Sequence, residues 1–227
     1  MLMACLAATL PVAAQAAPQA EIAIRWDPSQ GGPAELHDAF AALGLTHAAP
    51  QAFLVQYHAA SQPDHAPPGF GAVLRERSSG QASDTTYKLR GPAPAPDAFV
   101  GGWTCPLVGK AVVKYEIDLS WTGDATPRRA YSLSCTVGAP AAMAVPDGRL
   151  GAAAVRCSNR MERIHSGNVK AERWTFADGL QIIEVSLGNT RDNAAALEDF
   201  RRRIVAPLLE RGVRPLPDSK TELGSAC

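Results

Sequence analysis

The sequence has no excess charge of either sign and no segment built to cross a membrane. Among its 227 residues, 22 lysines and arginines balance 22 aspartates and glutamates. A general nucleic-acid binder would carry a basic excess, so the balance argues against a nucleic-acid partner. The uncharged N-terminal run is too short and too rich in alanine for a transmembrane helix, and no later segment reaches the ~20 apolar residues required. We expect a soluble chain without a transmembrane segment.

The sequence also lacks the short motifs of several enzyme classes. It contains neither the Gly-x-Ser-x-Gly turn of serine hydrolases nor a glycine-rich nucleotide loop. Its five histidines do not stand in the context of a catalytic triad, and no Cys-x-x-Cys pair suggests zinc. These absences leave the catalytic residues unassigned.

The first 20 residues contain no charge, and an apolar run there ends at Ala14-Gln15-Ala16. This is typical of a secretory signal peptide with a small-residue cleavage site. We expect residues 1–16 to be removed and residues 17–227 to form one domain, periplasmic or secreted. A lipoprotein cleavage site that anchors the chain at Cys5 is the alternative.

Four cysteines remain in the mature chain, an even number typical of disulfides in an oxidising compartment. They allow three pairings, which sequence alone cannot separate. The loose Ala/Pro/Gly-rich segment 138–154 lies between the second and the third, which favours a bond between those two. The last cysteine either fixes the tail or stays a free thiol. The four are Cys105, Cys135, Cys157 and Cys227.

Four short stretches alternate with the period of two that is typical of β-strands. Successive side chains of a strand point to opposite faces, so the charged residues of each stretch line one face of a sheet. Such a face suits either an anion-binding groove or barrel lumen, or the wet side of an ordinary antiparallel sheet. The stretches are residues 21–26, 73–77, 86–90 and 114–119.

The remaining pattern predicts an α+β fold that is mainly antiparallel β-structure, with seven to nine strands. A helix is expected over 33–43, and apolar residues spaced by three and four predict another from Asn193, which Pro207 would kink. Segment 91–109 should be irregular and 213–227 a polar tail. Further strands are expected at 53–57, 129–137, 155–163, 169–176 and 180–187.

Six cations on the alternating faces form the best candidate site. Arginine forks pair with phosphate oxygens and lysine supplies a point charge, so the set predicts a polyanion site. Cations crowded together without anions would repel one another. Nearby carboxylates could neutralise them as salt bridges, or could hold a divalent cation that bridges to phosphate. The cations are Arg25, Arg75, Arg77, Lys88, Arg90 and Lys114; the carboxylates are Glu21, Glu116, Asp118 and Glu184.

Several short motifs follow one another in an order that resembles the CYTH superfamily, the triphosphate tunnel metalloenzymes. That family includes bacterial triphosphatases, thiamine triphosphatase and class IV adenylyl cyclases. The resemblance covers residues 21–90 and 169–220. The motifs are Glu21-x-Ala23-x-Arg25, Gln56-Tyr57-His58, Leu74-Arg75-Glu76-Arg77, Thr86-Tyr87-Lys88, Lys114-Tyr115-Glu116-Ile117-Asp118, Glu184-Val185-Ser186-Leu187 and Ser219-Lys220.

The resemblance implies a closed or nearly closed, tunnel-like β-barrel whose lumen binds a triphosphate or polyphosphate. Arg75, Arg77 and Lys88, with Arg25 and Lys220, would contact phosphate. Mg²⁺ or Mn²⁺ would polarise the phosphoryl group. Its ligands would be Glu21, Glu116 and Glu184.

The sequence departs from the family in its acidic residues. Ala23 replaces the second glutamate of the opening motif, and the closing strand keeps Glu184 alone. Loss of carboxylates weakens a metal site, and export removes the protein from nucleoside triphosphates. We therefore expect a small polyanionic ligand to be bound without efficient catalysis. The alternatives are a cell-envelope structural or interaction protein with a salt-bridged lumen, and a metal-dependent triphosphatase or polyphosphatase.

Overall fold

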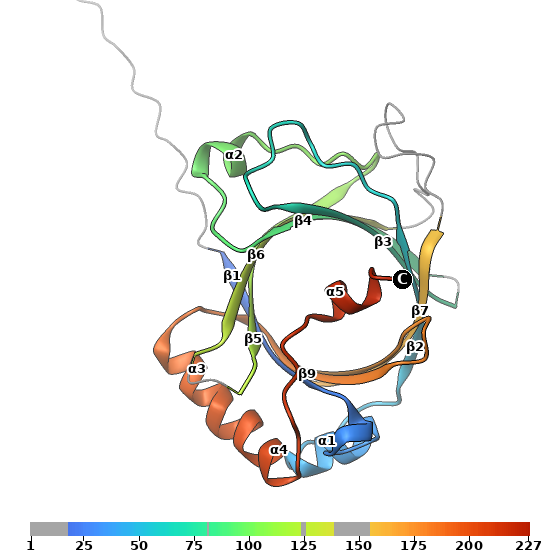
Figure 1. Cartoon of the computed structure of the whole chain (residues 1–227), viewed down its shortest axis with the longest axis vertical. Helices are drawn as coiled ribbons and strands as arrows, with labels where there is room; N and C mark the ends of the chain where they lie inside the picture. The colour runs from blue at the N-terminus through green and yellow to red at the C-terminus, as the bar shows by residue number, and fades with distance from the viewer. Residues whose placement is uncertain (1–17, 81, 124–125, 139–154) are drawn as a thin grey trace, which may run out of the picture.

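A computed structural model describes residues 18–80, 82–123, 126–138 and 155–227, and these form a closed barrel of nine strands (Figure 1). The order around the barrel is β1-β5-β6-β4-β3-β2-β7-β8-β9. The expected signal peptide and nearly all of segment 138–154 lie outside the described residues. The strands are β1 (Gln19–Trp26), β2 (Gln51–His58), β3 (Gly71–Ser79), β4 (Ala82–Gly91), β5 (Ala111–Trp121), β6 (Arg128–Gly138), β7 (Val155–Ser166), β8 (Val169–Thr175) and β9 (Gln181–Thr190).

The predicted fold class is confirmed, with one exception to its antiparallel pairing. Strand β1 lies between β9, which is antiparallel to it, and β5, which is parallel to it. Ile22 is the partner of Leu119 on one side and of Leu187 on the other. The first strand therefore closes the barrel.

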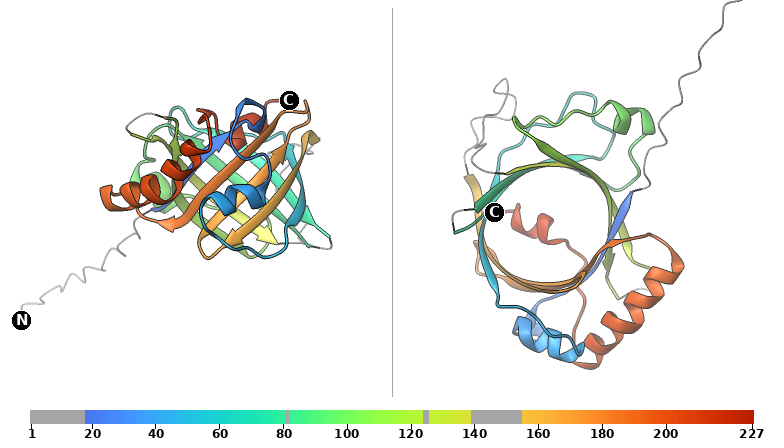
Figure 2. Two further views of the ribbon diagram at one scale, coloured as in Figure 1. Left: turned by 90° about the horizontal axis from the view of Figure 1, so that it is seen from below. Right: turned by 180° about the vertical axis from the view of Figure 1, so that it is seen from behind.

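The barrel carries apolar residues on its outer face, where helices cover them. Ile22, Ile24 and Trp26 of β1 are fully buried in a cluster that also holds Phe40 and Phe200. Burying one such side chain contributes about 1.5–3 kcal/mol, so this layer is a principal source of stability. The covering helices are α1 (Leu36–Ala42), α3 (Ala194–Phe200) and α4 (Ala206–Glu210), all on one side of the barrel (Figures 1 and 2).

The long C-terminal helix begins as predicted and continues through its proline. The Asn193 side chain accepts a hydrogen bond from the Ala196 N–H and caps the helix. Pro207 has no N–H to donate, and its ring would clash with the carbonyl four residues before it. The chain widens into a π-helical turn, η3 (Arg201–Val205), immediately before α4. None of the described helices is both long and apolar enough to cross a membrane.

A second apolar layer lies under segment 91–109, which was predicted to be irregular. The prediction was wrong for α2 (Asp97–Gly102), a short helix in that segment. Cys105 of this segment forms a disulfide with Cys135 on the outer face of β6. The disulfide fastens the covering segment to the barrel.

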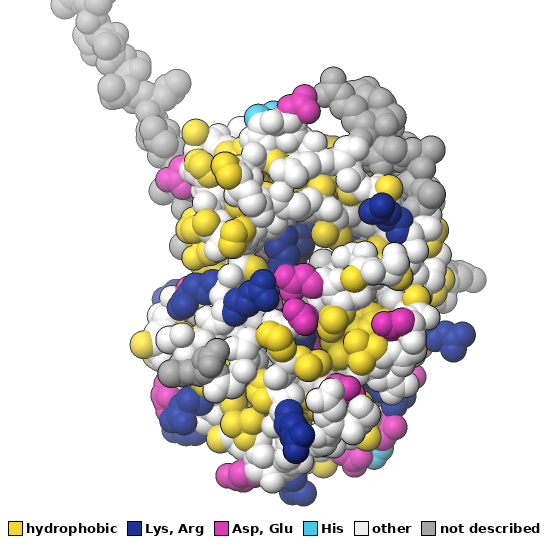
Figure 3. Space-filling view, in the orientation of Figure 1, with side chains coloured by type: hydrophobic (Ala, Val, Ile, Leu, Met, Phe, Trp, Pro, Cys, Tyr) yellow, Lys and Arg dark blue, Asp and Glu magenta, His cyan; other side chains and the backbone are white. Residues whose placement is uncertain are grey.

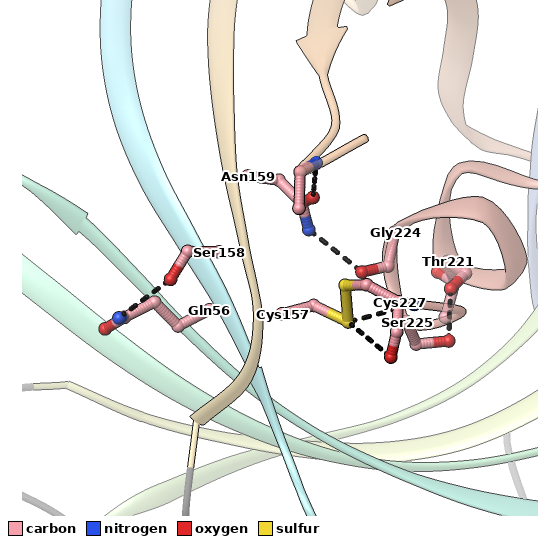
Figure 4. The surroundings of a disulfide bond; sticks show 9 residues. Gln56, Cys157, Ser158, Asn159, Thr221, Gly224, Ser225 and Cys227 are labelled. Atoms are coloured by element: carbon pink, nitrogen blue, oxygen red, sulfur yellow. Dashed lines mark hydrogen bonds between the residues drawn. A yellow bond between two sulfur atoms is a disulfide. The ribbon is translucent and has the colours of Figure 1, made fainter. Parts of the chain in front are cut away.

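The expected bond between Cys135 and Cys157 is therefore wrong. Cys135 faces outward from β6, whereas Cys157 on β7 faces the lumen, and β4, β3 and β2 separate the two strands. Cys157 instead bonds Cys227, the last residue (Figure 4).

The predicted polar tail enters the barrel and forms a helix there, α5 (Lys220–Gly224), seen inside the ring in Figures 1 and 2. Ser219 caps α5 by a reciprocal capping box with Glu222. The Asn159 side-chain amide donates to the Gly224 carbonyl at 2.9 Å. A Cβ at position 224 would lie 2.9 Å from a ring carbon of Tyr57, so the fit requires glycine.

Candidate functional site: the barrel lumen

The barrel encloses a polar cavity of about 230 Å³. Nine cationic side chains and four carboxylates line it, and basic and acidic side chains also gather around its mouth (Figure 3). All seven cations that the sequence assigned to a ligand are in this lining. They are Arg25, Arg75, Arg77, Lys88, Arg90, Lys114 and Lys220; the other two are Arg163 and Lys170.

The period of two brings these side chains to one surface. Arg75 and Arg77 are two residues apart on β3, as are Lys88 and Arg90 on β4, and all four line the lumen. Their neighbours Leu74 and Leu89 point outward into the second apolar layer. Polar side chains therefore line this part of the lumen and apolar ones lie outside it, whereas around α5 the lumen also holds an apolar cluster with Tyr57, Trp174 and Leu223.

Lys220 of α5 lies between two buried carboxylates. Its ammonium donates to Glu184 at 2.6 Å and to Glu172 at 2.7 Å, and both carboxylates are 1% exposed. Glu184 also pairs with Arg25, and Glu172 accepts hydrogen bonds from Arg163. Every oxygen of the two carboxylates thus has a cationic partner, and the tail supplies one partner to each.

Burial and the charges of neighbouring residues shift the pKa values in this group in opposite directions, and the neighbouring charges have the larger effect. Burial alone would raise the pKa of Glu172, but Lys220 and Arg163 hold that pKa well below its usual value. Burial would lower the pKa of Lys220, but Glu172, Glu184 and then Glu21 keep it above its ordinary value. Glu172 and Lys220 are therefore both charged at neutral pH.

Glu172 is the main lumen residue that sequence analysis missed. Segment 169–176 was predicted to be a strand, but no charge in it was assigned to the lumen. Lys170 and Glu172 of β8 are two residues apart, the same signal that identified the other lumen strands, and both line the cavity. Arg163 of β7 was missed as well.

The predicted metal ligands do not form a site that suits Mg²⁺ or Mn²⁺. Glu21 lies 3.2 Å from the Lys170 ammonium, and Glu116 lies 3.6 Å from that of Lys114. Glu184 is held between Arg25 and Lys220. The described part of the chain contains no group of three or more His, Cys, Asp or Glu residues placed to hold a metal ion. A divalent cation would have to displace ammonium or guanidinium partners, so metal ligation stays a prediction that the ion pairs do not favour.

Arg75 has a different environment from the other lumen cations. Within the described ranges it is the one cation of the lining without a carboxylate within 4.0 Å. Its Nη2 donates to the Thr86 hydroxyl at 3.3 Å, while its Nε is buried and has no hydrogen-bond partner. Its neighbour Arg77 is held by Asp84 at 2.6 Å, yet burial and then the charge of Arg75 lower the pKa of Arg77. The guanidinium of Arg75 thus has N–H donors that no described acceptor uses.

Because the pKa of Glu21 is low, the free energy of unfolding should fall as the pH is lowered. Burial would raise this pKa, but Lys220 and Lys170 lower it from 4.5 to about 2. A carboxylate with a depressed folded-state pKa contributes stability above its unfolded pKa and loses it as pH falls through the folded value. Allowing for the 26% exposure of Glu21, we expect a loss of about 2 kcal/mol between pH 4.5 and 2, measured by urea unfolding. Glu21→Gln should lose less over this interval; an equal loss in both proteins would contradict the assignment.

Sequence comparison identifies no relative: no protein-family model matches the chain, and no curated protein sequence matches it. Among solved structures, the chain is similar to the PH1819 protein of Pyrococcus horikoshii OT3 at 12% identity and a TM-score of 0.47, covering 89% of this chain and 97% of that one. It is also similar to the PH1012 protein of the same organism, at 16% identity and a TM-score of 0.42 over 89% and 98% of the two chains. A third similar structure, described as a "putative adenylate cyclase" from Vibrio parahaemolyticus, has 12% identity and a TM-score of 0.47 over 91% and 98%.

Proposed function

We propose that this chain is an exported protein whose barrel lumen binds a phosphate-rich anion without efficient turnover. The observation that carries the proposal is Arg75, a lumen guanidinium with no carboxylate partner among the described residues and with a buried Nε that donates to nothing. The Arg75 side chain is half-buried, and a partly desolvated charge without a counter-charge is costly. An oxyanion would neutralise it, because a guanidinium fork matches two phosphate oxygens.

The carboxylates of the lumen are poorly suited to catalysis. Glu21, Glu172 and Glu184 are each bound to lysine or arginine, and the pKa values of Glu21 and Glu172 lie far below neutrality. A general base works best with a pKa near the operating pH, so these groups would abstract a proton inefficiently. Binding is therefore favoured over hydrolysis.

Export rests on two features that agree. The N-terminal sequence is typical of a signal peptide. The described structure contains two disulfides, which form and persist mainly in oxidising compartments. Together they support a periplasmic or secreted protein.

A second candidate function is a cell-envelope structural protein whose lumen is only a salt-bridged interior. It is favoured by the ion pairs, because eight of the nine lumen cations have a carboxylate within 4.0 Å. The two candidates differ in what they predict for added phosphate.

Thermal unfolding of the mature protein in the presence of inorganic phosphate and tripolyphosphate separates the candidates. A ligand at 100 times its dissociation constant stabilises the folded state by about 2.7 kcal/mol, so the melting temperature should rise by several degrees. Arg75→Met should lose this rise. Arg160→Met removes a charge from the exposed outer side of the barrel and should keep it.

The remaining outcomes point to the alternatives. If no phosphate compound shifts the melting temperature, or if Arg75→Met retains the full shift, the salt-bridged structural protein becomes the better conclusion. Release of phosphate that requires Mg²⁺ or Mn²⁺ would identify an enzyme instead.

A further inference from the structure

We infer that the lumen binds one dianionic phosphoryl group, as in inorganic phosphate or a phosphate monoester, in preference to a linear triphosphate. The inference rests on the proposed function and specifies its ligand. Three observations lead to it: the charge balance of the lumen, the surroundings of Arg75, and the ion pairs of the remaining cations.

The charge balance of the lumen leaves a small positive excess. Nine cations line the cavity, and seven carboxylates form ion pairs with them; one of these, Glu222, is shared with Arg128 outside the lining, so the excess is two to three positive charges among the described residues. Uncompensated charge is costly to remove from water, so a ligand of matching charge is accommodated best. A phosphate monoester carries about −1.5 to −2 at pH 7. The carboxylates are Glu21, Asp84, Glu116, Asp118, Glu172, Glu184 and Glu222.

The one lumen cation without a carboxylate partner among the described residues, Arg75, lies with other polar side chains on the wall formed by β3, β4 and β6, where Lys88 has only a distant partner, Asp118 at 3.9 Å. Arg75 is the cross-strand partner of Thr86, and Thr86 is that of Thr136, so the three form a row across the strands. The Thr86 and Thr136 hydroxyls are 2.9 Å apart, and Arg75 donates to Thr86. The pair of Lys88 and Ser134 follows two residues further on and faces the same cavity. A guanidinium, an ammonium and three hydroxyls thus face the cavity along one stretch of this wall, where one phosphoryl group would bind.

The other cations of the lumen already form ion pairs with carboxylates. Arg163 of β7 and Lys220 of α5 bind Glu172 at 2.6 and 2.7 Å, and Lys170 of β8 binds Glu21 at 3.2 Å. Further phosphoryl groups of a longer chain would have to displace these carboxylates, of which Glu172 is buried at 1% exposure. Each additional group also adds negative charge beyond the small positive excess. Both effects oppose a triphosphate.

Titration calorimetry with inorganic phosphate, sulfate and tripolyphosphate tests the inference. We expect phosphate to bind at least as tightly as tripolyphosphate, and sulfate, also a compact dianion, to compete with it. Arg75→Met should weaken phosphate binding at least tenfold, while Arg75→Lys, which keeps the charge but loses the fork, should fall between. Tripolyphosphate binding tighter than phosphate would overturn the inference and leave the proposed function standing. Absence of binding by all three would overturn both.

A charge introduced beside Arg75 gives an independent test. Thr136→Glu places a carboxylate in the row with Arg75 and should take the place of the ligand. The ligand-free variant should melt at a higher temperature than wild type, and phosphate should no longer raise it. Thr136→Gln has the same size without the charge and loses one of the three hydroxyls, so it should not gain thermal stability and should keep a reduced response to phosphate. A full phosphate response in Thr136→Glu would show that the ligand binds elsewhere.

Discussion

Glu184→Gln should lower the free energy of unfolding by about 3–5 kcal/mol in a buffer that contains EDTA. Glu184 is 1% exposed and pairs with Arg25, whose side chain is 6% exposed, and with Lys220. Glutamine keeps the size but removes the charge, and its single amide oxygen could accept from Arg25 or from Lys220 in place of the two carboxylate oxygens that serve them, which leaves both cations without a counter-charge at this position. Urea unfolding with far-UV circular dichroism measures the loss.

Glu116→Gln is the matched control. Glu116 lies 3.6 Å from Lys114, which is 51% exposed, and such an exposed pair contributes only about 0–1 kcal/mol. The prediction separates two roles of Glu184. If Glu184 were a metal ligand, Glu184→Gln would change the stability of the metal-free protein little. The variant would instead no longer be stabilised by added Mg²⁺. A negligible effect in EDTA would therefore contradict the ion-pair role.

Cys157→Ser/Cys227→Ser should lower the free energy of unfolding by about 4 kcal/mol and loosen the C-terminal helix inside the barrel. The disulfide closes a loop with a sequence separation of 70 residues, and the chain-entropy relation for that length gives this magnitude. Without the disulfide, α5 is held by the ion pairs of Lys220 and by the hydrogen bond from the Asn159 side chain to the Gly224 carbonyl. Trypsin should then cleave after Lys220 far faster than in wild type, a change that mass spectrometry of the released C-terminal peptide would detect.

Cys105→Ser/Cys135→Ser is the control for the loss of a disulfide as such. The disulfide between Cys105 and Cys135 has a sequence separation of 30 residues and lies on the outer face of the barrel. Its loss should lower the free energy of unfolding by a similar but smaller amount. Lys220 should remain protected from trypsin in this variant. Equal cleavage in both variants would show that Cys227 does not hold the tail in the lumen.

The strands were predictable because each leaves a local signal. Segment 114–119 alternates charged and apolar residues, and β5 indeed directs Lys114 and Glu116 to the lumen and Leu119 to the helices. The order of strands around the barrel leaves no such signal. The alternation of charged and apolar residues in β1 does not show that this strand pairs in parallel with β5. That pairing depends on which surface of the barrel is covered by the elements that lie between the two strands in the sequence.

The cations of the site were predictable for the same reason, but their partners were not. Lys220 was assigned to a ligand by resemblance, whereas it binds Glu172 and Glu184, 48 and 36 residues before it. The same limit explains the disulfides. Cys135 and Cys157 are close in sequence, but they face opposite sides of the barrel wall. Distance along the chain does not record which face a residue occupies.

The position of β1 between β5 and β9 also determines when the barrel can form during synthesis. Arg25 meets Ser120 at a separation of 95 residues and Glu184 at a separation of 159. Contacts this distant in sequence carry a large loop-closure entropy and make folding slow. A chain emerging from its N-terminus keeps its first strand unpaired on one side until residue 190 has been made, so the barrel cannot close before almost the entire polypeptide is available.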